Sequence, residues 1–148
     1  IRFFLAAGAF CFCFWVGDLL RITGNRKTEQ KYLRNVTLLY EGQKIKTRGL
    51  IDTGNHLTAP ASGIPVHVAT AELMKRLCPV VKGVMYVPYR CVGSSGILPA
   101  VRIDEMKVEG EKDSFVIPKP WIAITKGSLS PCDEYEVLIQ KNDEGMQV

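Results

Sequence analysis

The sequence predicts a mainly β domain that follows a membrane-spanning helix. A 15-residue segment without a charged side chain lies near the start of the chain, at residues 3–17. After it, short apolar and β-branched stretches alternate with turn residues. All eight prolines lie beyond residue 59, which favours short strands and loops over long helices. With 148 residues, 47% of them hydrophobic, the chain is long enough for one globular domain and a short additional segment.

The apolar segment is expected to be a transmembrane helix. An amphipathic helix would carry polar residues at roughly 3.6-residue spacing, whereas this segment is apolar on all sides. Extending it through Leu20 brings it close to the roughly 20 residues that cross a bilayer. We therefore predict a helix over residues 1–20, the end of a longer membrane domain. A signal peptide fits less well because Arg21 and Arg26 follow without a small-residue cleavage site, and a buried core helix is the other alternative.

Residues 21–34 are predicted to form a basic juxtamembrane linker. The first 34 residues hold six basic and two acidic side chains, which is the whole excess of the net charge of +4. Because cytoplasmic loops are enriched in Lys and Arg, we expect the following domain to lie at the cytoplasmic face of the cell membrane, in contact with its lipid. Residues 35–148 have 13 basic and 13 acidic side chains, so nucleic-acid binding is not expected.

The cysteines indicate neither a disulfide framework nor a metal site. Cys11 and Cys13 lie in the apolar segment, and Cys78, Cys91 and Cys132 are scattered through the domain without a CxxC pair or a paired histidine spacing. No metal or cofactor is expected.

The predicted domain, residues 35–140, opens with a β-hairpin. Residues 35–40 are β-branched and apolar, Glu41-Gly42-Gln43 supplies a turn, and residues 44–51 alternate before they become apolar. This pattern predicts two paired strands.

A short amphipathic helix is predicted over residues 69–78, with Thr70 as its N-cap and Pro79 after its end. Ser130-Pro131 is expected to open a further turn or two of helix. Residues 141–148 are predicted to form a polar, flexible tail. The remaining strands are predicted over residues 83–90, 97–103, 105–108, 114–117, 121–125 and 136–140.

Asp52-Thr53-Gly54-Asn55 is the first candidate for chemistry. It follows the apolar strand end Gly49-Leu50-Ile51 directly, which places a carboxylate on a tight loop at a strand end. A carboxylate that shares a proton with a second one can activate a water, Thr53 can hydrogen-bond to a paired loop, and Gly54 permits close backbone approach. The alternative is that Asp52 caps the turn through its own side chain.

This arrangement resembles the active-site loop of aspartic peptidases. The hairpin 36–43 with the loop 49–54 looks like the amino-terminal half of a retropepsin protomer. Further segments are similar in order and spacing to the sporulation sigma-E factor-processing peptidases, a family of membrane-embedded aspartic peptidases of endospore-forming bacteria. These segments are Asn55-His56-Leu57-Thr58, Gly63-Ile64-Pro65-Val66, Val87-Pro88-Tyr89-Arg90 and Gly96-Ile97-Leu98-Pro99-Ala100. The region after Trp121 resembles retropepsins only loosely.

The resemblance implies a retropepsin-like protomer with Asp52 as the catalytic aspartate and Thr53, Gly54 and Asn55 as support for its loop. It also implies that the precursor of sigma-E is the substrate, and that a signalling protein from the forespore activates the peptidase from across the septum, with the protease on the mother-cell side. The chain has one Asp-Thr-Gly loop and the mechanism needs two carboxylates, so we expect a homodimer. The glycine-rich tip Gly93-Ser94-Ser95-Gly96 is expected to be a flap.

Other candidate residues have weaker support. Cys91 with His67 could supply a thiol and a base, but no spacing links them. His56 follows the candidate loop and could touch a substrate. Asp104 with Glu105 is expected to be solvated. Asp104 and Asp133 are the first candidates if the second carboxylate belongs to the same chain.

The competing hypothesis is a non-catalytic, membrane-anchored β domain that binds a cytoplasmic partner protein. In that case Asp52 only caps a turn. Replacement of Asp52 by Asn separates the two hypotheses.

Overall fold

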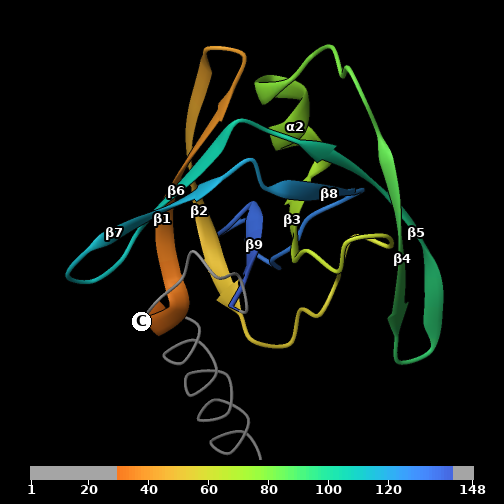
Figure 1. The fold of residues 1–148 in the computed structure, drawn as a ribbon. Helices are drawn as coiled ribbons and strands as arrows, with labels where there is room; N and C mark the ends of the chain where they lie inside the picture. Colours follow the sequence, from red (N-terminus) through yellow and green to blue (C-terminus); the bar gives the residue numbers. More distant parts are fainter. Residues whose placement is uncertain (1–29, 142–148) are drawn as a thin grey trace, which may run out of the picture. The chain divides into compact units, whose positions relative to one another are not determined.

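The computed structural model describes residues 30–141, and from Leu33 onward these residues form one unit with a nine-stranded mixed sheet (Figure 1). The order across the sheet is β4-β5-β8-β3-β9-β2-β1-β6-β7. In chain order the elements are β1 (Leu33–Tyr40), β2 (Gln43–Asp52), β3 (Val66–Thr70), α2 (Ala71–Leu77), β4 (Met85–Cys91), β5 (Ser94–Arg102), β6 (Glu105–Glu109), β7 (Ser114–Pro118), β8 (Trp121–Thr125) and β9 (Val137–Gln140).

The first hairpin forms as the sequence predicts. β1 and β2 pair antiparallel from Leu33 opposite Leu50 to Tyr40 opposite Gln43. The two residues between the strands, Glu41 and Gly42, both have positive φ, at 46° and 81°. Two-residue turns of this kind match the right-handed twist of the flanking strands and favour glycine.

The neighbouring strands at the centre of the sheet come from segments that lie far apart in the chain. β9 lies between β2 and β3 (Figure 1), pairing parallel with β2 and antiparallel with β3. β3 pairs parallel with β8 on its other side. The strand β3 is buried along its whole length, and the sequence analysis did not identify it as a strand. Strands that are buried on both faces lack the alternation by which half-buried strands are recognised.

Two apolar clusters stabilise the sheet. The larger cluster lies between α2 and β1, β2, β6 and β9, and its fully buried members include Leu38, Leu73 and Ile139. The smaller cluster includes Val66 and Val87, and the partly buried Leu57 packs against it. The smaller cluster therefore connects the hairpin of β4 and β5 to the loop after β2.

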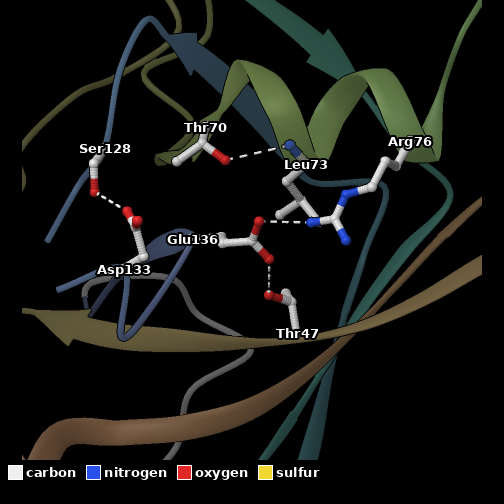
Figure 2. Close-up of polar contacts among 7 residues, drawn as sticks. All are labelled: Thr47, Thr70, Leu73, Arg76, Ser128, Asp133 and Glu136. Atoms are coloured by element: carbon white, nitrogen blue, oxygen red, sulfur yellow. Dashed lines mark hydrogen bonds and ion pairs between the residues drawn. The ribbon is translucent and has the colours of Figure 1, made fainter.

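Helix α2 is held by polar contacts at both ends. The Thr70 hydroxyl accepts a hydrogen bond from the Leu73 amide at 3.3 Å, which confirms the predicted N-cap (Figure 2). Near the other end, Arg76 pairs with the Glu136 carboxylate at 2.6 Å, and the second carboxylate oxygen accepts from Thr47 at 2.5 Å. Glu136 thus connects the helix to β2.

The prediction of a helix that begins at Ser130-Pro131 is wrong, because this segment forms a turn. The Ser130 hydroxyl accepts from the amides of Cys132 and Glu134, as an N-cap would. Asp133, however, has a φ of 51°, which lies outside the right-handed helical region, and its carboxylate contacts the Ser128 hydroxyl (Figure 2). The capping signal is real but no helix follows it.

The predicted membrane helix over residues 1–20 lies outside the described residues, as do most of the predicted linker and the tail. Within residues 30–141, no helix is long and apolar enough to span a bilayer.

Candidate active site

Asp52 is the last residue of β2, and its side chain is half-buried. β2 is hydrogen-bonded to β1 on one side and to β9 on the other, and Asp52 is in register with Gln140. The pairing with β1 ends at Leu50, so the strand next to Asp52 itself is β9, and this pairing places the carboxylate at the start of the following loop. The Gly54 amide donates to Asp52 Oδ1 at 2.9 Å.

The hydrogen bond from the Gly54 amide is the local turn cap that the sequence analysis gives as the alternative to a catalytic role of Asp52. It engages only Oδ1, so within the described part of the chain Oδ2 has no hydrogen-bond partner. A Cβ atom on Gly54 would lie 3.3 Å from Oδ1, which is a tight contact. Glycine at this position therefore lets the backbone approach the carboxylate. The cap and a catalytic role are compatible, because the cap orients the group and leaves one oxygen available.

Asn55 anchors the loop after Asp52. Its side chain is buried, with Nδ2 donating to the Val66 carbonyl at 3.1 Å and Oδ1 accepting from the Leu57 amide at 3.0 Å. These two contacts hold the backbone of the loop, and a role of Asn55 in supporting an active site stays a prediction. Thr53, in contrast, is exposed and has no hydrogen-bond partner among the residues that the structure describes.

A cleft of about 660 Å³ lies between this loop and the β4–β5 hairpin. Asp52 is the one carboxylate among its described lining residues, and Arg90 and His56 are basic or titratable side chains in the same cleft. The rest of the lining is mainly apolar. It comprises Gly54, Asn55, Leu57, Thr58, Pro60, Val68, Pro88, Tyr89, Cys91, Leu98, Thr125 and Leu138. The cleft is large enough for several side chains of an extended peptide.

The residues predicted to form a flap lie in the β4–β5 hairpin, whose tip comes earlier in the chain than predicted. Cys91 is opposite Ser94, so Val92 and Gly93 form the tip, and Ser94, Ser95 and Gly96 belong to β5. The reason is that Gly93 supplies the positive φ of the turn, at 82°, which leaves the next three residues free to extend the strand.

Gly96 has a packing role within the hairpin. It is opposite Tyr89, and a Cβ atom on Gly96 would lie 2.8 Å from a carbon of the Tyr89 ring. The ring therefore covers Gly96 at the cleft. The glycine leaves room for an aromatic side chain there, whereas the sequence analysis assigned it to a mobile tip.

Two other predicted combinations are not assembled. His67 is fully buried and its Nδ1 accepts from the Gln140 amide at 3.0 Å, whereas Cys91 is exposed in the cleft, so the two do not form a nucleophile and base. Asp104 accepts from the Glu41 amide at 2.6 Å, at the opposite end of β2 from Asp52. Across a strand of 10 residues this separation is about 30 Å.

Asp133 bonds with Ser128 and does not line the cleft. Within residues 30–141 there is no group of three or more His, Cys, Asp or Glu side chains with a geometry suited to a metal ion.

The sequence analysis missed Gln140, and it considered His67 only as a possible base for Cys91. Both are buried polar side chains, exposed by 0% and 2%. Gln140 Nε2 donates to the carbonyls of Asn55 and Leu57 at 2.7 and 3.2 Å. The signal was a single polar residue within an apolar stretch, in Val66-His67-Val68 and at the end of Val137-Leu138-Ile139. Such residues are hydrogen-bonded when buried, so their partners mark a structurally demanding region.

Comparison with known proteins gives a family match over almost the whole chain. The family described as Sporulation factor SpoIIGA matches residues 2–142. The sporulation sigma-E factor-processing peptidase of Priestia megaterium is 26% identical over 132 residues, covering 72% of this chain and 42% of that relative. The probable sporulation sigma-E factor-processing peptidase of Clostridium acetobutylicum is 24% identical over 132 residues, covering 86% of this chain and 48% of that relative. The chain thus spans less than half the length of these relatives, and no solved structure matches it significantly.

Proposed function

Because this chain belongs to the Sporulation factor SpoIIGA family, we propose that it is an aspartic endopeptidase that cleaves the precursor of sporulation sigma-E factor, with Asp52 as the catalytic residue. The names of the two relatives support the substrate. The observation that carries the catalytic assignment is the half-buried Asp52 carboxylate at the end of β2, beside a cleft of about 660 Å³. A retropepsin-like arrangement of the protomer is part of this proposal.

The second carboxylate of the mechanism comes from Asp52 of another copy of the chain. Two observations support a homodimer: Asp52 is the one acidic residue in the described lining of the cleft, and Thr53 is exposed, as a residue that bonds to a paired loop would be. With two Asp52 side chains at a two-fold axis, the ionised carboxylate takes a proton from a water, which attacks the peptide carbonyl, and the protonated carboxyl donates to the carbonyl oxygen.

Residues 1–20 anchor the protease in the cell membrane, with the β domain on the cytoplasmic, mother-cell side of the sporulation septum. The uncharged segment 3–17 and the basic residues that follow it support this part of the proposal. A signalling protein from the forespore would then act on the membrane part of the protein, from the other side of the septum.

The test is co-expression of the full-length protein with the sigma-E precursor in a bacterium that does not sporulate, followed by gel mobility of the precursor. Asp52→Asn should abolish cleavage, because the amide cannot take up or release the proton. Asp113→Asn is the matched control, since Asp113 is exposed and lies in the turn between β6 and β7. Cleavage by the Asp52→Asn protein at the wild-type rate would favour the competing hypothesis, a non-catalytic domain that binds a partner protein.

A mixing experiment tests the dimer. If Asp52→Ala protein and wild type are combined in equal amounts and pair at random, about a quarter of the dimers keep both carboxylates. Activity per dimer should fall to about a quarter of the wild-type value, because a mixed dimer cannot share the proton. Activity that tracks the amount of wild type, with subunit exchange shown by crosslinking, would place the second carboxylate in the same chain.

A further inference from the structure

We infer that Gln140 is a positioning residue for the catalytic loop, holding the backbone after Asp52 in its active conformation. The inference rests on the proposed function, since it assigns a role within the same site. It starts from the place where β3 and β9 separate, and from the side chains that fill that place.

The antiparallel pairing of β3 and β9 ends next to the loop that follows Asp52. Its last pair on this side is Val68 with Leu138, and continued pairing would bring Val66 opposite Gln140. Instead, the Val66 carbonyl accepts from Asn55 Nδ2 at 3.1 Å, and the Gln140 amide donates to His67 Nδ1 at 3.0 Å. Side chains thus replace the strand-to-strand hydrogen bonds, so the loop is inserted where the two strands diverge.

Gln140 holds this inserted loop from both of its ends. Its backbone is in register with Asp52, where the loop begins. Its side-chain amide donates to the carbonyl of Asn55 at 2.7 Å and to the carbonyl of Leu57 at 3.2 Å, on either side of His56. Because a side-chain amide has two N–H donors and no charge, it suits two convergent carbonyl oxygens in a buried position.

The backbone of Gln140 is itself held by a neighbouring histidine. The Gln140 amide donates to Nδ1 of the fully buried His67 at 3.0 Å, so the ring keeps Gln140 in place. Gln140 does not line the cleft, so it acts on catalysis through the loop and makes no contact with a substrate there.

The experiment compares Gln140→Met and Gln140→Glu with the wild type, using the full-length protein purified in detergent. Methionine keeps the shape but removes both donors, and an ionised glutamate would place its oxygens against two carbonyl oxygens. Gln43→Met is the matched control, because Gln43 is an exposed glutamine at the start of β2, opposite Tyr40. Each protein is assayed for kcat and KM on the sigma-E precursor, and for amide hydrogen exchange by peptide.

For Gln140→Met we expect kcat to fall at least tenfold, with KM within about twofold of the wild-type value, because misplacement of a reacting group by about 1 Å costs up to about a hundredfold in rate. Exchange should accelerate in residues 53–57 and stay unchanged in the β1–β2 hairpin. Gln140→Glu should lose at least as much rate, and Gln43→Met should match the wild type.

Unchanged kcat and unchanged loop exchange in Gln140→Met would overturn the inference. Acceleration of exchange across β1 and β2 as well would also overturn it, since that result means general destabilisation. If the wild type itself does not cleave the precursor, the proposed function fails, and the exchange pattern alone still decides whether Gln140 holds the loop.

Discussion

Gly49 allows a direct test of how tightly the strand that carries Asp52 is packed. It lies three residues before Asp52, and a Cβ atom there would be 2.8 Å from Val36 Cγ2 and 3.0 Å from Ile139 Cδ1. Both distances are shorter than the 3.4–4 Å of ordinary van der Waals contact. Overpacking of this kind lowers the free energy of unfolding by roughly 1–3 kcal/mol. Replacing glycine raises it by about 0.5–1 kcal/mol, because the unfolded chain loses conformational freedom.

We therefore expect Gly49→Ala to lower the free energy of unfolding by about 1–2 kcal/mol, which corresponds to a fall in Tm of roughly 5–10 °C for a domain of this size. Thermal unfolding followed by circular dichroism measures this. Because β2 must shift against β9 to admit the methyl group, kcat on the sigma-E precursor should fall as well.

A substitution of the neighbouring Ile139 side chain tests the packing argument. Ile139→Val removes Cδ1, so it should cost less in the Gly49→Ala background than in the wild type, a coupling between the two sites. Gly83→Ala is the control, because no atom lies within 4 Å of the added Cβ and φ is not positive. Equal stability of Gly49→Ala and Gly83→Ala, or strict additivity with Ile139→Val, would refute the packing argument.

Four other outcomes are expected. Thr70→Ala should lower the free energy of unfolding by about 1 kcal/mol through loss of the helix N-cap. Thr70→Ser should keep most of the wild-type stability in the same thermal assay, because serine retains the hydroxyl. Burial raises the pKa of the Cys78 thiol, so iodoacetamide at neutral pH should label the exposed Cys91 and leave Cys78 unmodified in peptide mass spectra of the folded protein. Gly96→Ala should displace the Tyr89 ring and lower kcat/KM several-fold without a comparable fall in Tm. Cleavage rates should follow a bell-shaped pH dependence if, as proposed, two Asp52 carboxylates of a dimer share one proton, and a flat profile from pH 5 to 9 would contradict a paired-carboxylate mechanism.

The raised pKa of Cys78 also has a consequence for stability with a defined sign. Above the ordinary thiol value of 9.0 the unfolded chain loses this proton while the folded chain retains it. The folded state therefore binds more protons, and its stability should fall as the pH rises through this range. Urea unfolding at several alkaline pH values measures the slope, and Cys78→Ala should flatten it.

Local patterns were sufficient for the outer parts of the fold. The hairpin of β1 and β2 was predicted from a β-branched, apolar stretch, a turn and a second stretch that alternates. In the structure one face of β1 is buried at Val36, Leu38 and Tyr40. The N-cap of α2 was predicted because a threonine before an amphipathic stretch has a local partner. The strands β4 to β9 were predicted for similar reasons, with boundaries that differ by a few residues.

The centre of the sheet could not be predicted in this way. The pairing of β2 with β9 joins residues 49–52 to residues 137–140, and nothing in either segment indicates its partner. Asp52 was identified because its motif is local. The contacts from Gln140 were not, because they depend on that long-range pairing. The region after Ser130 shows the opposite error. The capping signal was identified correctly, but no helix forms because Asp133 has a left-handed backbone conformation.

The long-range pairing of β9 also determines when the site can exist during synthesis. β9 is among the last of the described residues to be made, yet it lies between β2 and β3 and borders Asp52. A chain that is still being translated, or one cut before Val137, has the Asp-Thr-Gly motif but neither the strand beside it nor the contacts that fix its loop. Contacts of high sequence separation form late and slowly. The fold therefore delays the assembly of the Asp52 site until β9 has been made.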